Sequence, residues 1–146
     1  FSSINIFYFK MWGIYNIKSL RTAVLGGAYS VDKDYRLLMG YNWFPNEQMN
    51  KTERQLAYKE IAGGHFDLIL SHTCPYDWRP TWLFLSMIDQ DKVDNSTEKF
   101  FQEIANITEF NKWYCGHFHD NTILFKNGYM LFNHIITLDE AMKGKY

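Results

Sequence analysis

Two histidines spaced two residues apart are the side chains in this chain best suited to chemistry. They lie in the tetrapeptide Gly116-His117-Phe118-His119, directly after the apolar residues 113–115. Because side chains alternate along an extended backbone, we expect both imidazoles on the same side. Their ring nitrogens could then reach two metal ions about 3.5–4 Å apart, the spacing found in two-metal hydrolases. Gly116 is expected to leave room where the backbone passes close to such a site.

A third histidine is expected at the same edge of a sheet. Residues 67–75, with the sequence DLILSHTCP, predict a buried strand that ends at His72. In open α/β sheets, ligands collect outside the carboxyl ends of the strands. We therefore expect the ring nitrogens of His72, His117 and His119 to lie within about 7 Å of one another. For each of them, an ordinary histidine at a strand end or in a surface turn is the alternative.

Composition limits the possible classes of function. The 146 residues leave room for one domain, residues 1–146. A net charge of −1 gives no electrostatic attraction for nucleic acid. No apolar run approaches the ~18 residues that span a bilayer, so no membrane partner is expected. Because the first residues also lack the order of a signal peptide, we expect a cytoplasmic protein. Cys74 and Cys115 are expected as small buried hydrophobic residues, with a structural zinc site as the alternative.

The pattern of apolar residues and turn residues predicts an α/β fold. Strands rich in β-branched and aromatic residues are expected at 4–10, 13–17, 21–25, 66–71, 112–115, 121–125 and 129–132. The first two strands are expected to pair with each other. The last two flank Asn127-Gly128, a strong hairpin signal.

Two helices are marked by asparagines that are each followed by a glutamate three residues later, the pattern of a capping box. The first helix begins at Asn50 and ends near residue 62, and the second begins at Asn95 and ends near residue 107. The inward stripe of the first helix is expected to contain Leu56, Ala57 and Ile61. Residues 28–49 and 73–94 are expected to be long loops, which in compact domains are usually functional.

The strand ending at His72, followed by Gly116-His117-Phe118-His119, resembles the second half of a calcineurin-like metallophosphoesterase. Residues 26–36 (GGAYSVDKDYR) also resemble a bacterial and phage branch of that family. The resemblance covers the whole chain. It implies a β-sandwich flanked by helices, in α/β/β/α layers, with two metal ions between the sheets.

The resemblance also implies a phosphate-ester substrate and two divalent metal ions (Mn, Fe or Zn) that activate a bridging water. His72 and His117 would ligate one metal and His119 the other. Arg36 could contact the phosphate, because its planar fork of donors matches phosphate oxygens. Asp32 could help to steer the phosphate or its leaving group. An ordinary salt bridge between Asp32 and Arg36 is the alternative.

Three motifs of the family's first half, Asp-x-His, Gly-Asp-x-x-Asp and Asn-His, are missing ahead of His72, and the one Asn-His pair in the sequence, Asn133-His134, lies near its C-terminal end. The chain also opens with Phe1 rather than Met. We therefore expect the C-terminal portion of a phosphomonoesterase or phosphodiesterase that supplies only part of the metal ligands and is inactive alone. Self-association, or pairing with the missing N-terminal half, is expected. The alternatives are a catalytically incomplete remnant or split subunit, and a binding module with a single structural zinc.

Overall fold

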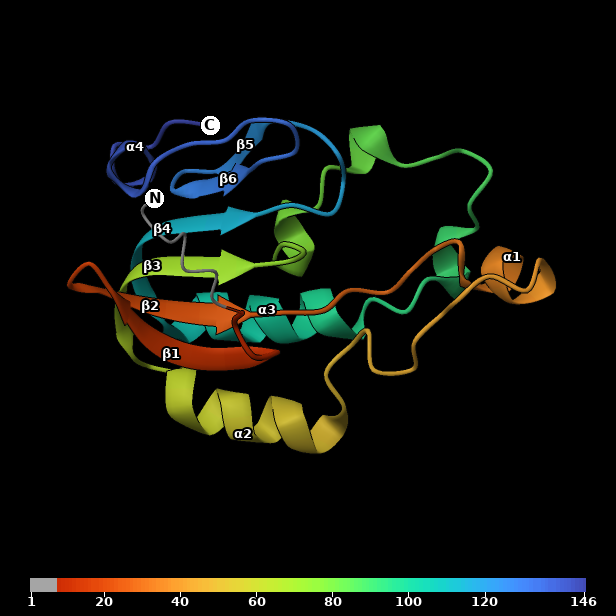
Figure 1. Cartoon of the computed structure of the whole chain (residues 1–146), viewed down its shortest axis with the longest axis horizontal. Coiled ribbons are helices and arrows are strands. Elements are labelled where there is room, and N and C mark those ends of the chain that lie inside the picture. The colour runs from red at the N-terminus through yellow and green to blue at the C-terminus, as the bar shows by residue number, and fades with distance from the viewer. Residues whose placement is uncertain (1–7) are drawn as a thin grey trace, which may run out of the picture.

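The described part of the chain is built on one six-stranded mixed sheet (Figure 1). The computed structural model describes residues 8–146. The strands are β1 (Trp12–Ile17), β2 (Leu20–Leu25), β3 (His65–Ser71), β4 (Glu109–Cys115), β5 (Thr122–Phe125) and β6 (Gly128–Met130). They are ordered β1-β2-β3-β4-β6-β5, with β2, β3, β4 and β6 parallel and the two outer strands antiparallel to their neighbours. The predicted α/β class is confirmed.

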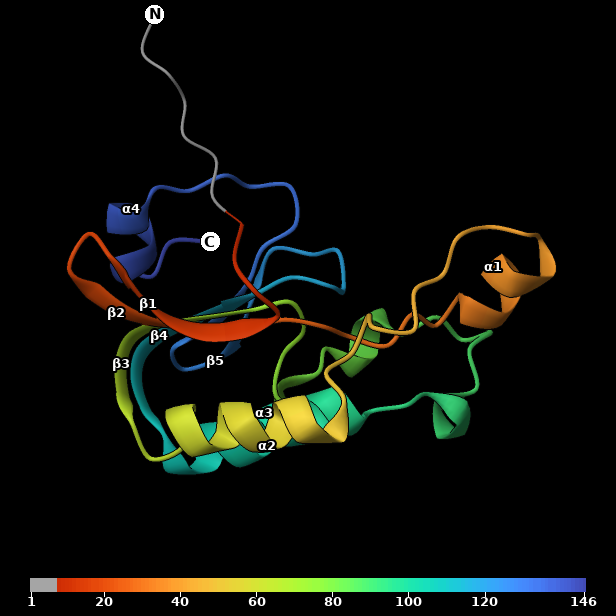
Figure 2. The ribbon, with the colours of Figure 1, turned by 60° about the horizontal axis from the view of Figure 1, so that its bottom comes forward.

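Helices cover the two faces of the sheet unequally. The helices are α1 (Lys33–Leu38), α2 (Lys51–Ile61), α3 (Ser96–Ile107) and α4 (Leu138–Met142), with short 3-10 helices at Tyr76–Trp78, Thr81–Leu83 and Gln90–Lys92. The crossover helices α2 and α3 lie together on one face, and α4 lies on the other (Figure 2). The segment that contains α1 projects beyond the carboxyl ends of the parallel strands (Figure 1). Between residues 8 and 146, no helix is both long and apolar enough to cross a bilayer.

The side chains of the central strands alternate between two apolar clusters. Ile69 and Trp113, both fully buried, pack into the large cluster with residues of α2 and α3. Leu68 and Tyr114 belong to a smaller cluster with Tyr129, which α4 closes. Both faces of β3 and β4 are therefore apolar, as expected for parallel strands covered on both sides.

Only one of the two predicted capping boxes forms. At α2, Asn50 Oδ1 accepts a hydrogen bond from Glu53 N at 3.0 Å, and Glu53 Oε2 accepts one from Asn50 N at 2.8 Å. The helix α3 begins where predicted, but Asn95 makes no side-chain cap. Its Oδ1 instead accepts a hydrogen bond from Arg79 Nη1 at 2.7 Å, a charge-assisted bond that replaces the weaker cap.

Leu56 does not belong to the inward stripe of α2. Ala57 and Ile61 are fully buried, whereas Leu56 is 46% exposed. The two buried residues are four positions apart and so share one face of the helix, and Leu56 lies one position away, about 100° around the axis. The prediction for Leu56 was therefore wrong.

The predicted strand at 4–10 falls largely outside the described residues: residues 4–7 are not described, and residues 8–10 are irregular. Within the described residues, β1 has a partner that was not predicted. It pairs with β2 through Lys18 and Ser19, whose φ values are 48° and 69°. Two consecutive positive φ values are the geometry of a tight two-residue hairpin turn, which usually carries Asn or Gly. The turn was missed because neither residue gives that signal.

Two other elements differ in extent, and the last hairpin forms with its turn one residue earlier than predicted. The expected loop at 28–49 contains the short helix α1, and β4 begins at Glu109, three residues before the predicted strand. The strands β5 and β6 pair as predicted, but the turn between them is Lys126-Asn127, and Gly128 is the first residue of β6. Gly128 is required there, because a Cβ would lie 2.7 Å from the ring of buried Trp78.

Candidate functional site

His72 is held between the two strands that neighbour β3. Its N–H donates to Leu25 O at 3.1 Å, at the end of β2, and its carbonyl oxygen accepts from Gly116 N at 2.9 Å, just beyond β4. The three strands run parallel and end at the same edge of the sheet. The backbone of His72 is therefore fixed at the edge where ligands collect in such sheets.

A set of buried and partly buried hydrogen bonds fixes the residues on either side of His72. Trp113 Nε1 donates to Ser71 Oγ at 2.7 Å, and Ser71 Oγ donates to Thr73 O at 2.6 Å. The hydroxyl of Thr73 donates to Glu98 Oε1 at 3.0 Å. Trp113 and Thr73 have no exposed surface. The end of β3 is thus anchored both to the core and to the first turn of α3.

The two other histidines lie in a strained turn, not on extended backbone as predicted. The strand β4 ends at Cys115, and Phe118 N donates to Gly116 O at 3.0 Å. With φ of 74° at the central residue, His117, this bond closes a rare, strained form of γ-turn. His119 also has a positive φ, 58°. Each such conformation costs on the order of 1–3 kcal/mol, and residues held this way cluster at functional sites.

Two glycines near the strand ends differ in how closely other atoms approach them. A Cβ on Gly116 would lie 3.4 Å from Leu131 O and 3.8 Å from His72 O, which are ordinary contacts. Gly27, in contrast, has a φ of 90°, and a Cβ there would lie 2.7 Å from Glu47 O. The described residues therefore do not crowd Gly116, and its expected role beside a metal site stays a prediction, while Gly27 lets the two ends of the long 28–49 segment meet.

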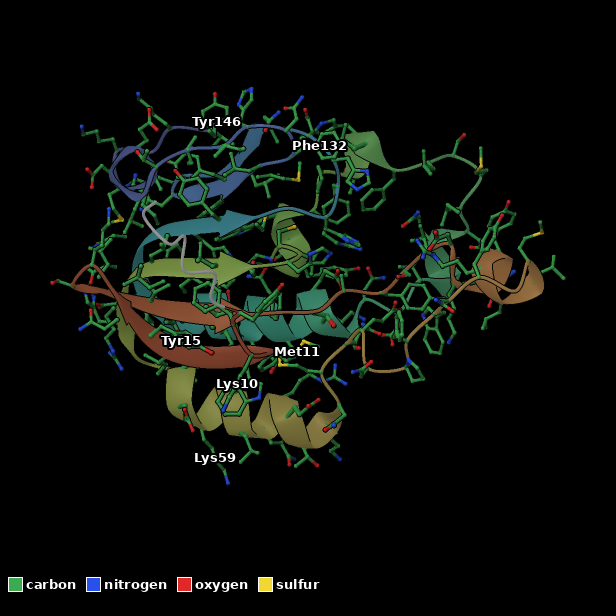
Figure 3. The ribbon with its side chains drawn as sticks, viewed as in Figure 1. Lys10, Met11, Tyr15, Lys59, Phe132 and Tyr146 are labelled. Carbon is green, nitrogen blue, oxygen red and sulfur yellow. The ribbon has the colours of Figure 1, made fainter. Side chains whose placement is uncertain are left out.

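The structure brings the rings of His72 and His117 together. His117 Nδ1 lies 3.3 Å from His72 Nε2. Two nitrogens bound to one tetrahedral zinc at ~2.05 Å lie about 3.3 Å apart, so the pair fits two corners of such a site. The distance also fits a hydrogen bond between the rings when one nitrogen carries the proton. The ring of His119 stacks on Phe132 at 4.8 Å between centroids. Figure 3 shows Phe132 at the end of the sheet to which β3 and β4 point.

All three histidines are electrostatically coupled. Burial, together with the neighbouring His72 and His119, lowers the pKa of His117 to about 4, although the charge of Glu47 opposes this shift. Burial, and then the charge of His119, also lowers the pKa of His72. His72 and His117 are therefore favoured in their neutral forms, the forms that bind metals.

Residues 8–146 do not contain a complete metal site. They contain no group of three or more His, Cys, Asp or Glu side chains placed to hold a metal ion. A zinc site in a protein has three or four protein ligands, and two-metal sites need more. His72, His117 and His119 therefore do not form a complete metal site among the described residues, and their role as metal ligands stays a prediction.

Glu47 is a carboxylate near the site that sequence reasoning missed. Its Oε1 accepts from Ser30 N at 3.0 Å and its Oε2 from Ser30 Oγ at 2.6 Å. It is the one carboxylate whose charge acts on the pKa of His117 in the described part of the chain. The only signal in the sequence was its place in a long loop expected to be functional.

Asp32 and Arg36 pair with each other. Arg36 Nε and Asp32 Oδ2 form an ion pair of 2.7 Å at the start of α1. Neither residue lines the cavity beside the histidines, whereas Tyr29 and Val31 of the same loop do. A phosphate contact at Arg36 stays a prediction.

The two cysteines are buried and free, as expected. A hydrogen bond with Cys74, and then burial, raises the pKa of the Cys115 thiol well above its usual range. Because zinc binds the thiolate, this environment disfavours a zinc ligand at Cys115.

A cavity of about 330 Å³ opens beside the turn of His117 and His119. Its wall combines that turn with the segment 79–95 and the start of α3.

Comparisons of the chain with protein-family models, curated proteins and solved structures found no match.

Proposed function

We propose that this chain is part of a metal-dependent phosphoesterase, in which it supplies imidazole ligands of a dinuclear metal centre. The observation that carries the proposal is the 3.3 Å approach of His117 Nδ1 to His72 Nε2 at the carboxyl ends of adjacent parallel strands. His119 would serve the second metal. The substrate would be a phosphomonoester or a phosphodiester.

The remaining ligands, including a bridging carboxylate, would come from residues outside this sequence. Two dications a few ångströms apart repel strongly unless negative ligands lie between them. The same missing residues would form the second sheet of an α/β/β/α sandwich. Asp32 and Arg36 would contact the phosphate only if the α1 segment lies over the completed site.

Of the alternatives, a structural zinc module is supported least. Such a site needs a closed set of four ligands, and thiolates are the usual ones. Residues 8–146 contain no such group, and the pKa of the Cys115 thiol is raised. The other alternative is a remnant that binds no metal, and a measurement of metal affinity distinguishes it from the proposed function.

The test is a calorimetric titration of the chain with Mn²⁺ and with Zn²⁺. We expect binding that weakens at least tenfold in His72→Ala and in His117→Ala, because each removes a ligand. His65→Ala is the matched control, since His65 lies at the opposite end of β3 and should leave the affinity unchanged. Affinities that are equal in all four proteins would contradict the proposal.

Activity tests the incomplete ligand set separately. With Mn²⁺ and either p-nitrophenyl phosphate or bis(p-nitrophenyl) phosphate, the chain alone should give no turnover above that of His117→Ala. Turnover that disappears in His117→Ala would show that this chain is a sufficient enzyme.

A further inference from the structure

The cavity beside the histidines is mainly apolar. Its volume of about 330 Å³ lies at the lower end of the ~300–1,000 Å³ typical of small-molecule sites. Five of its apolar wall residues come from one stretch of chain between β3 and α3. They are Leu83, Phe84, Leu85, Ile88 and Val93. Such a wall favours a flat or aliphatic group over a sugar, whose hydroxyls would lose their hydrogen bonds to water.

The apolar wall is joined directly to the turn that carries the histidines. Phe84 stacks on Phe118 with ring centroids 5.8 Å apart and an interplanar angle of 24°. Phe118 lies between His117 and His119, and all three residues line the cavity. A phosphate held at the histidines would therefore place its ester group against this wall.

One polar residue of the cavity lacks a full set of partners. Glu98 is only 4% exposed, and Thr73 Oγ1 donates to its Oε1. Its Oε2 has no hydrogen-bond partner among the described residues. Burial raises the pKa of this carboxyl, against the opposing effects of the Thr73 bond and the Arg79 charge. A buried oxygen that accepts no hydrogen bond destabilises the folded chain, and a hydrogen-bond donor on a ligand would supply the partner that Glu98 Oε2 lacks.

We propose that this cavity binds the alcohol portion of the phosphate ester. That portion is a flat aromatic group whose far edge carries a hydrogen-bond donor for Glu98. The assignment rests on the phosphoesterase function proposed above. The apolar wall supplies affinity, and Glu98 sets the orientation. The ester oxygen then points toward His117 and His119. The substrate class is an aryl phosphate with an amino or hydroxyl group opposite the ester.

The test measures binding of aryl ethers in the presence of EDTA, so that failure of metal binding cannot affect it. The probes are 2-amino-7-methoxynaphthalene and 2-methoxynaphthalene, in which the ether oxygen stands for the ester oxygen and donates no hydrogen bond, so that they differ only in the amino donor. By fluorescence titration, the amino compound should bind the unmodified chain about tenfold more tightly or better, as expected for a hydrogen bond to a charged group. This comparison needs no variant.

Three variants, one of them a control, locate the binding. Glu98→Gln keeps an oxygen for Thr73 and turns a donor to the ligand, so the preference for the amino probe should fall to within twofold. Glu103→Gln, an exposed position on the same helix, should keep the full preference. Ile88→Trp should fill the cavity and weaken both probes at least tenfold. Equal binding of the two probes to the unmodified chain would overturn the role of Glu98, and no binding of either would overturn the site.

Discussion

The ends of β3 and β4 each deliver a histidine to the same edge of the sheet, but they are held in opposite ways. His72 lies on ordinary backbone that is hydrogen-bonded to both neighbouring strands. His117 lies at a φ of 74° in a three-residue turn. The first position is fixed by the core beneath it. The second is a strained conformation that the surrounding structure must impose.

The difference shows two ways to position a ligand. At the end of β3, the hydrogen bonds of Trp113, Ser71 and Thr73 stabilise the fold and place His72 at the same time. At the end of β4, placing His117 costs free energy. Changes near β3 should therefore lower stability, and some changes at the β4 turn should raise it.

The largest effect is expected from breaking the anchor of β3. Trp113 is fully buried and donates to Ser71 Oγ, so Trp113→Ala should lower the free energy of unfolding by about 3–5 kcal/mol. Urea denaturation measures this change. Trp113→Phe is the control that keeps most of the apolar ring, and it should cost clearly less. A loss below about 1 kcal/mol in Trp113→Ala would mean that the end of β3 does not depend on this anchor.

The sequence predicted the anchored end well and the strained end poorly. The apolar strand ending at His72 and the helix beginning at Asn50 follow from periodicity and local capping, which depend on near neighbours along the chain. The positive φ at His117 and His119 depends on contacts from distant segments, and histidine carries only a weak preference for it. The same holds for Glu47 and Glu98, whose importance appears only when the loops meet the strand ends.

Acid should weaken the fold through the histidine pair. The pKa of His117 is lowered from its ordinary value of 6.5 to about 4 in the folded chain, where it faces His72, His119 and Glu47. The unfolded chain therefore binds more protons between these values. The stability contributed by neutral His117 is complete above about pH 6.5 and is lost as the pH falls toward 4, by at most about 3 kcal/mol.

The measurement is urea denaturation at several pH values from 4 to 7, compared with His117→Asn. Asparagine tolerates a positive φ and does not titrate, so it isolates the imidazole from other acid-sensitive groups. As the pH falls from 7 to 4, the free energy of unfolding of the unmodified chain should decrease more than that of His117→Asn. A constant difference would show that His117 titrates alike in the folded and unfolded chains.

The smallest effect is expected from substitutions that compare the backbone conformations at His117 and His72 directly. His117→Gly and His117→Ala both remove the imidazole, but alanine keeps a Cβ at a positive φ. Strain relief in glycine outweighs its greater freedom in the unfolded chain, so His117→Gly should be the more stable by about 0.5–1 kcal/mol. At His72, where φ is not positive, the order should reverse, with alanine the more stable by a similar amount. Urea denaturation of the four variants measures both differences. The same order at both positions would mean that the turn after β4 is not strained.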